Sequence, residues 1–397
     1  MMQILLSPRR LSGIDAARGV ALFGMVSTHV LPLYSPDTGT ATWAALVFSG
    51  RASGLFAVIA GIGIAFLTGG SSPHRGASLT ADRRGIAVRA LIIGLIGLAL
   101  GGLETSIALI LFHYAALFLV ALPFAGLSFR PLAVWAGTWI VLSPVAAYLL
   151  RPTMGQAASH PSLGANPTFH DFLDPQVLLT NIFLTGYYPV LQWMSFVLVG
   201  MAVGRLDLKR LSVQLGLLGA GLTGAIVAKV VSAQLLDQGG GLQVLLNTPA
   251  GQTRPLEAML DVGLTGIDQS GTWWWLAVSA PHSGTPFDLL HVAGSAMAVI
   301  AVCLMLTRKH RNWLLPLSAT GAMTLTLYSL HVAVMSVADQ QDPLPDPVQL
   351  FWIQTVIAVG LGLFFHHMKF RGPLELLISQ AARAARETPG GVRDEID

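Results

Sequence analysis

Several ionisable side chains of this chain lie within, or at the ends of, long apolar stretches. Counted at about 1.5 Å of rise per helical residue, they fall near one end of those stretches. They come from five separate segments: His29, Arg51, Glu104, Asp288, His291 and His331. An ionisable group inside a lipid bilayer costs at least a few kcal/mol, so it usually faces the interior of a helix bundle and marks a functional site. We therefore expect these groups to converge at one depth.

Histidine is the natural proton acceptor for chemistry near neutral pH. We expect His29 to act as a general base, with His291 or His331 as the alternative. A guanidinium held in a dry site stabilises negative charge on a reacting carbonyl oxygen, and Arg51 is expected to do so. A single histidine in a helix more often has a structural role, so the prediction depends on the convergence of several.

A further polar set is predicted to line a path from this cluster towards the middle of the bundle. Its members are on the fourth and sixth apolar segments: His113, Tyr114, Tyr187, Tyr188, Gln192 and Trp193. The two tyrosines at 187 and 188, the glutamine and the tryptophan are expected to contact a substrate, together with Glu104 and Asp288.

A basic region is predicted at the opposite end of the bundle. Asp15 and Arg18 are three residues apart and share one helix face. About 21 Å of helix separates Asp15 from His29, so this carboxylate cannot orient that imidazole. Asp15 and Arg18 form either an ion pair or part of a phosphate site. Arg89 is expected on the same side, and guanidinium groups match phosphate oxygens, although the rule that cytoplasmic loops are basic explains most of these charges.

The composition is that of a membrane protein. Of the 397 residues, 53% are hydrophobic and 11% are charged, and the mean hydropathy is +0.64. Soluble domains have roughly 25% charged residues, so a soluble enzyme is excluded. Apolar stretches of the length that crosses a bilayer predict an all-α polytopic bundle of about ten transmembrane helices, near 14–35, 52–69, 86–103, 105–127, 131–150, 178–204, 212–235, 286–306, 314–337 and 348–368.

The distribution of Lys and Arg predicts that both termini are cytoplasmic, in a multi-pass protein of the plasma membrane. Residues 1–370 are expected to form one transmembrane domain. Residues 371–397 form a tail, an amphipathic helix followed by ten disordered residues. The long outer loops, about 151–177 and 236–285, are expected to be ordered covers, and the tryptophans at 273–275 within the second suit a membrane interface.

Metal and nucleic-acid partners are not expected. The only cysteine, Cys303, excludes an intramolecular disulfide and a thiolate metal cage. No pair of histidines has metal-ligand spacing. The net charge of +3 comes without a basic stripe interleaved with aromatic residues, which disfavours nucleic-acid binding.

The residues that open the first span resemble a known family. Residues 10–22 read Arg-Leu-Ser-Gly-Ile-Asp-Ala-Ala-Arg-Gly-Val-Ala-Leu. This string resembles the Arg-x-x-x-hydrophobic-Asp-x-x-Arg-Gly start of the heparan-α-glucosaminide N-acetyltransferase-like family and of the related DUF418 membrane proteins. Residues 54–61 in the second span and residues 321–331 are similar to further segments of these families.

The resemblance implies a bundle of ten or eleven helices that transfers an acyl group, typically acetyl, from cytosolic acyl-CoA to an extracytoplasmic sugar, envelope glycan or lipid acceptor. Acyl-CoA is then expected near Asp15, Arg18, Arg89, His113 and Tyr114. The family's proposed catalytic histidine lies between the first two spans, where residues 35–40 contain none. Either His29 takes that role or the chemistry differs. The resemblance also suggests a homodimer.

A proton-coupled transporter or a lipid or glycan flippase is the alternative. The same histidines suit a proton relay or a head-group site. Transporters of this kind often contain a matching pair of broken helices in their two halves. The sequence shows no such pair, which favours the acyltransferase.

Overall fold

The computed structural model describes residues 11–35, 37–158, 165–253, 255–264, 267–310 and 312–387. Arg10, which opens the family-like string, and the ten C-terminal residues predicted to be disordered lie outside these ranges. The described chain is helical and contains no strand longer than the single bridge between Tyr34 and Ala41.

Twelve helices form the bundle and its tail. They are α1 (Ser12–Val30), α3 (Arg51–Leu67), α4 (Gly76–Gly101), α5 (Leu111–Ala121), α6 (Phe129–Leu150), α8 (Val190–Gly204), α9 (Leu211–Asp237), α13 (Pro286–Leu306), α14 (Leu315–Gly321), α15 (Thr324–Ala338), α16 (Pro347–His367) and α17 (Pro373–Arg386). Shorter helices connect them: α2 (Trp43–Phe48), η1 (Leu122–Gly126), η2 (Arg151–Ala158), η3 (Phe169–Leu173), α7 (Pro175–Thr180), η4 (Asn181–Thr185), α10 (Gly241–Leu246), α11 (Pro249–Thr253), α12 (Leu256–Val262) and η5 (Trp273–Ala277).

Six helical segments among the described residues are long and apolar enough to cross a membrane, and the number rises to eight if each of two bent helix pairs is one span. Each of the ten predicted stretches does coincide with helix, but α1 and α5 are not among the eight. The fourth stretch was predicted from residue 105. Its helix begins only at Leu111, because residues 103–110 are not helical. The structure therefore supports six to eight spans.

Both bent pairs are broken at identifiable residues. The segment Pro175–Thr185 meets α8 at 50°, and Gly186 and Pro189 lie between them. α14 meets α15 at 81°. This second break corrects the prediction that the sequence holds no pair of broken helices.

The second break carries no proline, and its cause is tertiary packing. Gly321 lies against α1 so closely that a Cβ atom there would clash with the carbonyl oxygen of Asp15. The first free N–H groups of α15, those of Leu325 and Thr326, donate to Glu375 of α17 at 2.7 and 3.1 Å. A helix start needs such partners for its backbone donors, and here a distant carboxylate supplies them.

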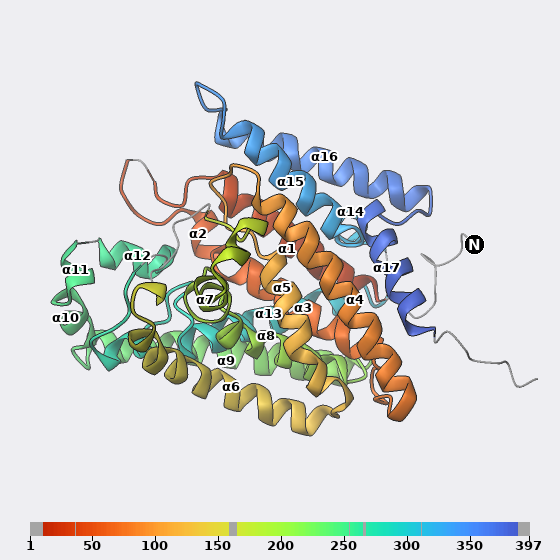
Figure 1. The fold of residues 1–397 in the computed structure, drawn as a ribbon, viewed down its shortest axis with the longest axis horizontal. Helices are drawn as coiled ribbons and strands as arrows, with labels where there is room; N and C mark the ends of the chain where they lie inside the picture. The colour runs from red at the N-terminus through yellow and green to blue at the C-terminus, as the bar shows by residue number, and fades with distance from the viewer. Residues whose placement is uncertain are drawn as a thin grey trace, which may run out of the picture.

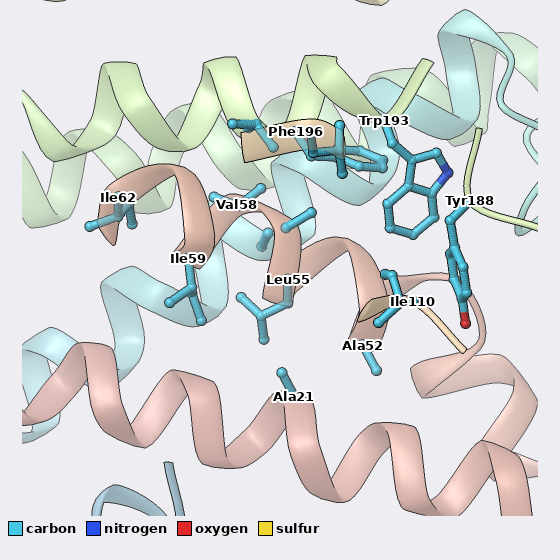
Figure 2. Packing of buried hydrophobic residues seen from close by; sticks show 14 of the residues in the cluster. Ala21, Ala52, Leu55, Val58, Ile59, Ile62, Ile110, Tyr188, Trp193 and Phe196 are labelled. Atoms are coloured by element: carbon cyan, nitrogen blue, oxygen red, sulfur yellow. The ribbon is translucent and has the colours of Figure 1, made fainter. Parts of the chain in front are cut away.

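Helix α3 lies at the centre of the bundle, between α1 and α8 (Figure 2). Ala21 of α1 and Phe196 of α8 lie on either side of Leu55 and Val58. α3 and α8 approach closely because Gly200 has no side chain: a Cβ atom there would be 1.9 Å from the carbonyl oxygen of Val58. Small residues at such crossings permit the close backbone contact that stabilises helix pairs in membranes.

The two ends of the bundle differ (Figure 1). At one end α10, α11 and α12 form a cover with its own apolar cluster around Trp275, as expected for the second long loop. Trp275 is fully buried, so the interface interpretation fits the exposed Trp273 but not this tryptophan. At the other end the tail helix α17 packs on α4. Arg386 binds the buried carboxylate of Asp82 at 2.5 Å.

Candidate functional site

A chain of three polar side chains links α1, α15 and α16. Nδ1 of His29 lies 3.0 Å from Nε2 of His331, and Nδ1 of His331 lies 2.6 Å from Oε1 of Gln354. The two imidazole rings are stacked, with centroids 5.2 Å apart and planes within 10°. His331 and Gln354 are buried and His29 is partly buried. The structure thus brings two of the predicted histidines into direct contact and adds a glutamine that sequence analysis missed.

Arg51 and His291 form a second, separate group. Nε of Arg51 donates to Nε2 of His291 at 2.9 Å, and Nδ1 of His291 donates to the carbonyl oxygen of Ala225 at 3.0 Å. Both ring nitrogens of His291 are therefore engaged, and the pair joins α3, α9 and α13. Arg51 also donates to the carbonyl oxygen of Leu46 at 2.9 Å. No hydrogen bond connects this group to His29 or His331 within the described chain.

Asp288 is buried in the first turn of α13. Its Oδ2 accepts from the N–H of Gly284 at 3.0 Å, and its own N–H donates to the hydroxyl of Thr285 at 3.1 Å. These bonds fix the entry into the helix, in the manner of an N-cap. Asp288 interacts electrostatically with Arg51, so it belongs to the second group.

His282, in the segment that precedes α13, was not predicted. Its ring lies among Tyr187, Tyr188 and Trp193, with centroid separations of 4.4, 5.9 and 6.1 Å. It is close enough to His29 for an electrostatic interaction. Burial lowers the pKa of His282 to about 4, because the apolar surroundings disfavour the charged form. The sequence signal that points to it is a histidine directly after a proline, in a loop that leads into a span.

An inner cavity of about 280 Å³ lies between α1, α3, α4, α5, α15 and α17. Arg18 and Arg89 line it at one end, and Nε of Arg89 is buried with no hydrogen-bond partner in the described structure. Arg18 binds Asp15 at 2.7 Å and also donates to the carbonyl oxygen of Gly321 at 3.1 Å. The ion pair expected at this end is therefore formed. It borders a cavity whose charged lining residues are Arg18, Arg89 and Glu375.

The histidine pair lies one helical turn beyond this cavity. Met25 and Tyr328 line the cavity. His29 follows Met25 by four residues and His331 follows Tyr328 by three, so each histidine shares a helix face with a cavity residue. The rings of Tyr328 and His331 are 6.4 Å apart. The cavity thus runs from the guanidinium groups towards the two imidazoles.

An outer cavity of about 350 Å³ is lined by parts of α5, α7, η3 and η4. His113 and Tyr187 are in its wall, and Nε2 of His113 faces Gly186 without a hydrogen-bond partner among the described residues. Tyr114 lines the inner cavity instead. Consecutive helical residues point about 100° apart, so His113 and Tyr114 face different spaces. The single path predicted from these side chains is therefore two cavities.

The remaining predicted residues are buried or exposed as follows. Tyr188 and Trp193 are buried beside His282, and the hydroxyl of Tyr188 donates to the carbonyl oxygen of Ala108 at 3.3 Å. Gln192 is also buried, and its side chain lies against Gly284. Glu104 corrects the prediction that places it at the outer end of the fourth span with the other polar groups: it is exposed in the non-helical segment between α4 and α5. No group of three His, Cys, Asp or Glu side chains that could hold a metal ion is present in the part of the chain that the structure describes.

Comparison with known families identifies a match. The model of a family described as heparan-alpha-glucosaminide N-acetyltransferase, catalytic, matches residues 10–232, which is more than half of the chain. The match includes the string at 10–22 and the segment at 54–61, whereas the segment at 321–331 lies beyond it. No match was found to a curated protein.

Proposed function

The chain belongs to the heparan-alpha-glucosaminide N-acetyltransferase catalytic family, and on this premise we propose that it transfers an acetyl group from cytosolic acetyl-CoA to a sugar on the other face of the membrane. The observation that carries the proposal is the inner cavity, which has two arginines at one end and the His29–His331 pair one turn beyond the other. A ten-span topology with both termini cytoplasmic, a location in the plasma membrane and a homodimer belong to the same proposal.

The inner cavity has the chemistry of a site for the acyl donor. Acetyl-CoA carries phosphates at one end and a thioester at the other, joined by a thin flexible arm. Arg18 and Arg89 supply guanidinium donors for phosphate oxygens, and a buried Arg89 Nε without a protein partner is suited to such a ligand. Apolar residues of α3, α4 and α5 line the space between the arginines and Tyr328. The arm would lie there, with the thioester towards the histidines.

His29 is the proposed general base. Its Nδ1 faces His331, so Nε2 is the nitrogen that meets the acceptor. As the acceptor oxygen or nitrogen attacks the thioester carbonyl carbon, its proton passes to Nε2. The C–S bond then breaks, coenzyme A leaves as thiolate, and the imidazolium returns the proton to sulfur. The products are the acetylated acceptor and coenzyme A, and His29 is neutral again.

The acceptor is proposed to enter from the outer cavity. Tyr187 lines this cavity and also contacts His282, which in turn interacts with His29. These contacts support a path for a polar acceptor from the cavity to the base. The family name supports an amino sugar as the first acceptor to be tried, and an envelope glycan or lipid as the next.

The test compares two acyl donors on the purified protein. Acetyl-CoA and acetyl-pantetheine carry the same thioester, but only the first carries the nucleotide and its phosphates. We expect transfer to glucosamine from both, and we expect Arg89→Ala to raise KM about 10-fold for acetyl-CoA alone. Arg84→Ala removes an exposed cation of the same helix as the matched control. Equal effects of both variants on both donors would refute the donor site.

A transporter is the second candidate, because the described structure contains two bent pairs of apolar helices, one in each half of the chain. Broken helices place free backbone groups at the midplane of many secondary transporters. Counterflow measured in proteoliposomes without any CoA thioester distinguishes the two functions. Exchange of labelled sugar under those conditions favours transport, and its absence together with acetyl transfer favours the enzyme.

A further inference from the structure

We infer that Gln354 of α16 is a positioning residue, which fixes the tautomers of His331 and His29 so that Nε2 of His29 is an unprotonated acceptor. The catalytic meaning of this inference rests on the proposed acetyl transfer. The tautomers themselves are a property of the protein alone.

The donor and acceptor roles along this chain of hydrogen bonds are set by Gln354. Its Oε1 can only accept, so Nδ1 of His331 must carry the proton across the 2.6 Å contact. The orientation of the amide is set by its other end, where Nε2 lies 3.7 Å from the sulfur of Met335. The amide NH₂ thus faces a weak acceptor, and the carbonyl oxygen faces His331.

The proton positions then follow along the chain. A neutral imidazole has one N–H and one lone pair on its two nitrogens. Because Nδ1 of His331 is the donor, its Nε2 is the acceptor in the 3.0 Å contact with His29. Nδ1 of His29 must donate there, which leaves the lone pair of His29 on Nε2. A change at Gln354 therefore reaches His29 through two hydrogen bonds, although the glutamine is on a different helix.

A neutral amide at this position differs from a carboxylate in its charge and in its inability to accept a proton. Gln354 cannot take a proton from His331, so the chain ends there and no proton leaves the pair through α16. The tautomers are set without adding a negative charge inside the bundle, where a charge is costly. Besides these partners, the ring of Tyr328 lies beside His331, and the imidazole of His282 interacts electrostatically with His29.

The competing explanation is that Gln354 only anchors α16. This helix is largely exposed in the described structure, and Gln354 and Gly362 are its only buried residues. A hydrogen bond to His331 would then serve to hold the helix in place. The two explanations differ in what they predict for the imidazole protons of His29.

NMR measures directly which ring nitrogen of each histidine carries the proton. Protein labelled with ¹⁵N-histidine, in detergent and without substrate, is compared with His29→Asn and His331→Asn to assign the two rings by NMR. We expect both rings of the native protein in the Nδ1–H form. In Gln354→Met, which keeps the volume but removes the acceptor, we expect His29 to shift wholly or partly to the Nε2–H form.

Kinetics supply the second measurement. In Gln354→Met we expect kcat to fall at least ~10-fold while KM for acetyl-CoA stays unchanged, because only the base is affected. Gln214→Met replaces a buried glutamine of α9 that donates to the carbonyl oxygen of Leu208, and it should leave both the kinetics and the histidine spectra unchanged.

Three results would overturn the inference. They are an Nε2–H tautomer for His29 in the native protein, an unaltered His29 tautomer in Gln354→Met, or a Gln354→Met variant whose melting temperature falls while its kcat does not. If the native protein transfers no acetyl group but shows the expected tautomers and their change, the proposed function fails and the structural inference stands. A variant that does not fold is replaced by Gln354→Leu for the same NMR comparison.

Discussion

A histidine's contacts decide what it can do, and the histidines of this chain illustrate the point. Both nitrogens of His291 are engaged, one by Arg51 and one by a backbone carbonyl. Among the described residues, only one nitrogen of His29 has a hydrogen-bond partner, which is His331. The first arrangement fits a structural crosslink and the second fits a base, although both residues have the same type and nearly the same expected depth.

Substitution should separate these two roles. We expect His29→Asn to lower kcat by about 100-fold or more, because the general base is lost, with little change in melting temperature. We expect His291→Asn to destabilise the fold by about 1–3 kcal/mol, because a partly buried guanidinium and a carbonyl lose a partner. Acetyl-transfer kinetics and thermal unfolding in detergent are measured on both. Full activity in His29→Asn would contradict the assignment.

Protonation of His282 should make the fold sensitive to acid. Its pKa is lowered to about 4 by burial, below the usual value near 6.5. Between these values the unfolded chain binds a proton that the native protein does not, so stability rises with pH in that window and is lost as pH falls from about 6.5 to 4. We expect His282→Asn to reduce this loss. Asparagine tolerates the positive φ of 58° at this position.

Melting temperatures measured at intervals from pH 7 to pH 4 test this prediction. The exposed His367→Asn variant controls for the loss of any histidine. If the native protein and His282→Asn lose stability in parallel, the buried imidazole is not the group responsible.

The charged part of the candidate site was predictable, and the neutral part was not. The sequence predicts His29 and His331 as site residues because ionisable groups in apolar segments are costly, and because counting along helices places both at one depth. Gln354 is uncharged and lies in a largely apolar helix, so it gives no comparable signal. His282 comes from a loop, whose path only tertiary structure determines. The separation into two cavities depends on the rotation of α5, which residue spacing does not fix.

At the scale of elements, apolar length predicts where helices occur but not where they break. The first break was predictable from Gly186 and Pro189. The second follows from contact of Gly321 with α1 and from the carboxylate of Glu375, which is distant in sequence. The same contacts explain why the amphipathic tail helix lies against the bundle.

The crossing of α3 and α8 provides a test at this scale. A Cβ atom at Gly200 would be 1.9 Å from a backbone oxygen of Val58, and backbone cannot yield as a flexible side chain can. We expect Gly200→Ala to destabilise the protein by about 1–3 kcal/mol. Gly216→Ala in α9 is the matched control, since a Cβ there meets nothing within 4 Å, and it should be neutral or stabilising by up to ~1 kcal/mol. Equal melting temperatures would show that the two helices are farther apart.

At the scale of the molecule, the arrangement of the cavities matters most. The inner cavity is lined by the arginines of α1 and α4 and by the tail helix, whereas the outer cavity is lined by α5, α7 and the short helices near them. The His29–His331 pair interacts with groups next to each cavity. An enzyme built in this way would take its two substrates from opposite sides of a membrane.

Vesicles test this arrangement without any need to control how the protein is oriented. With acetyl-CoA outside and glucosamine trapped inside, every molecule whose inner end faces outward can form product. With both substrates outside, each protein molecule exposes only its donor cavity or only its acceptor cavity to them. No product should therefore form until detergent opens the vesicles. Arg89→Ala vesicles should need more acetyl-CoA in the first arrangement and remain inactive in the second. Product from intact vesicles with both substrates outside would mean that donor and acceptor enter from one side, which the two-cavity arrangement does not allow.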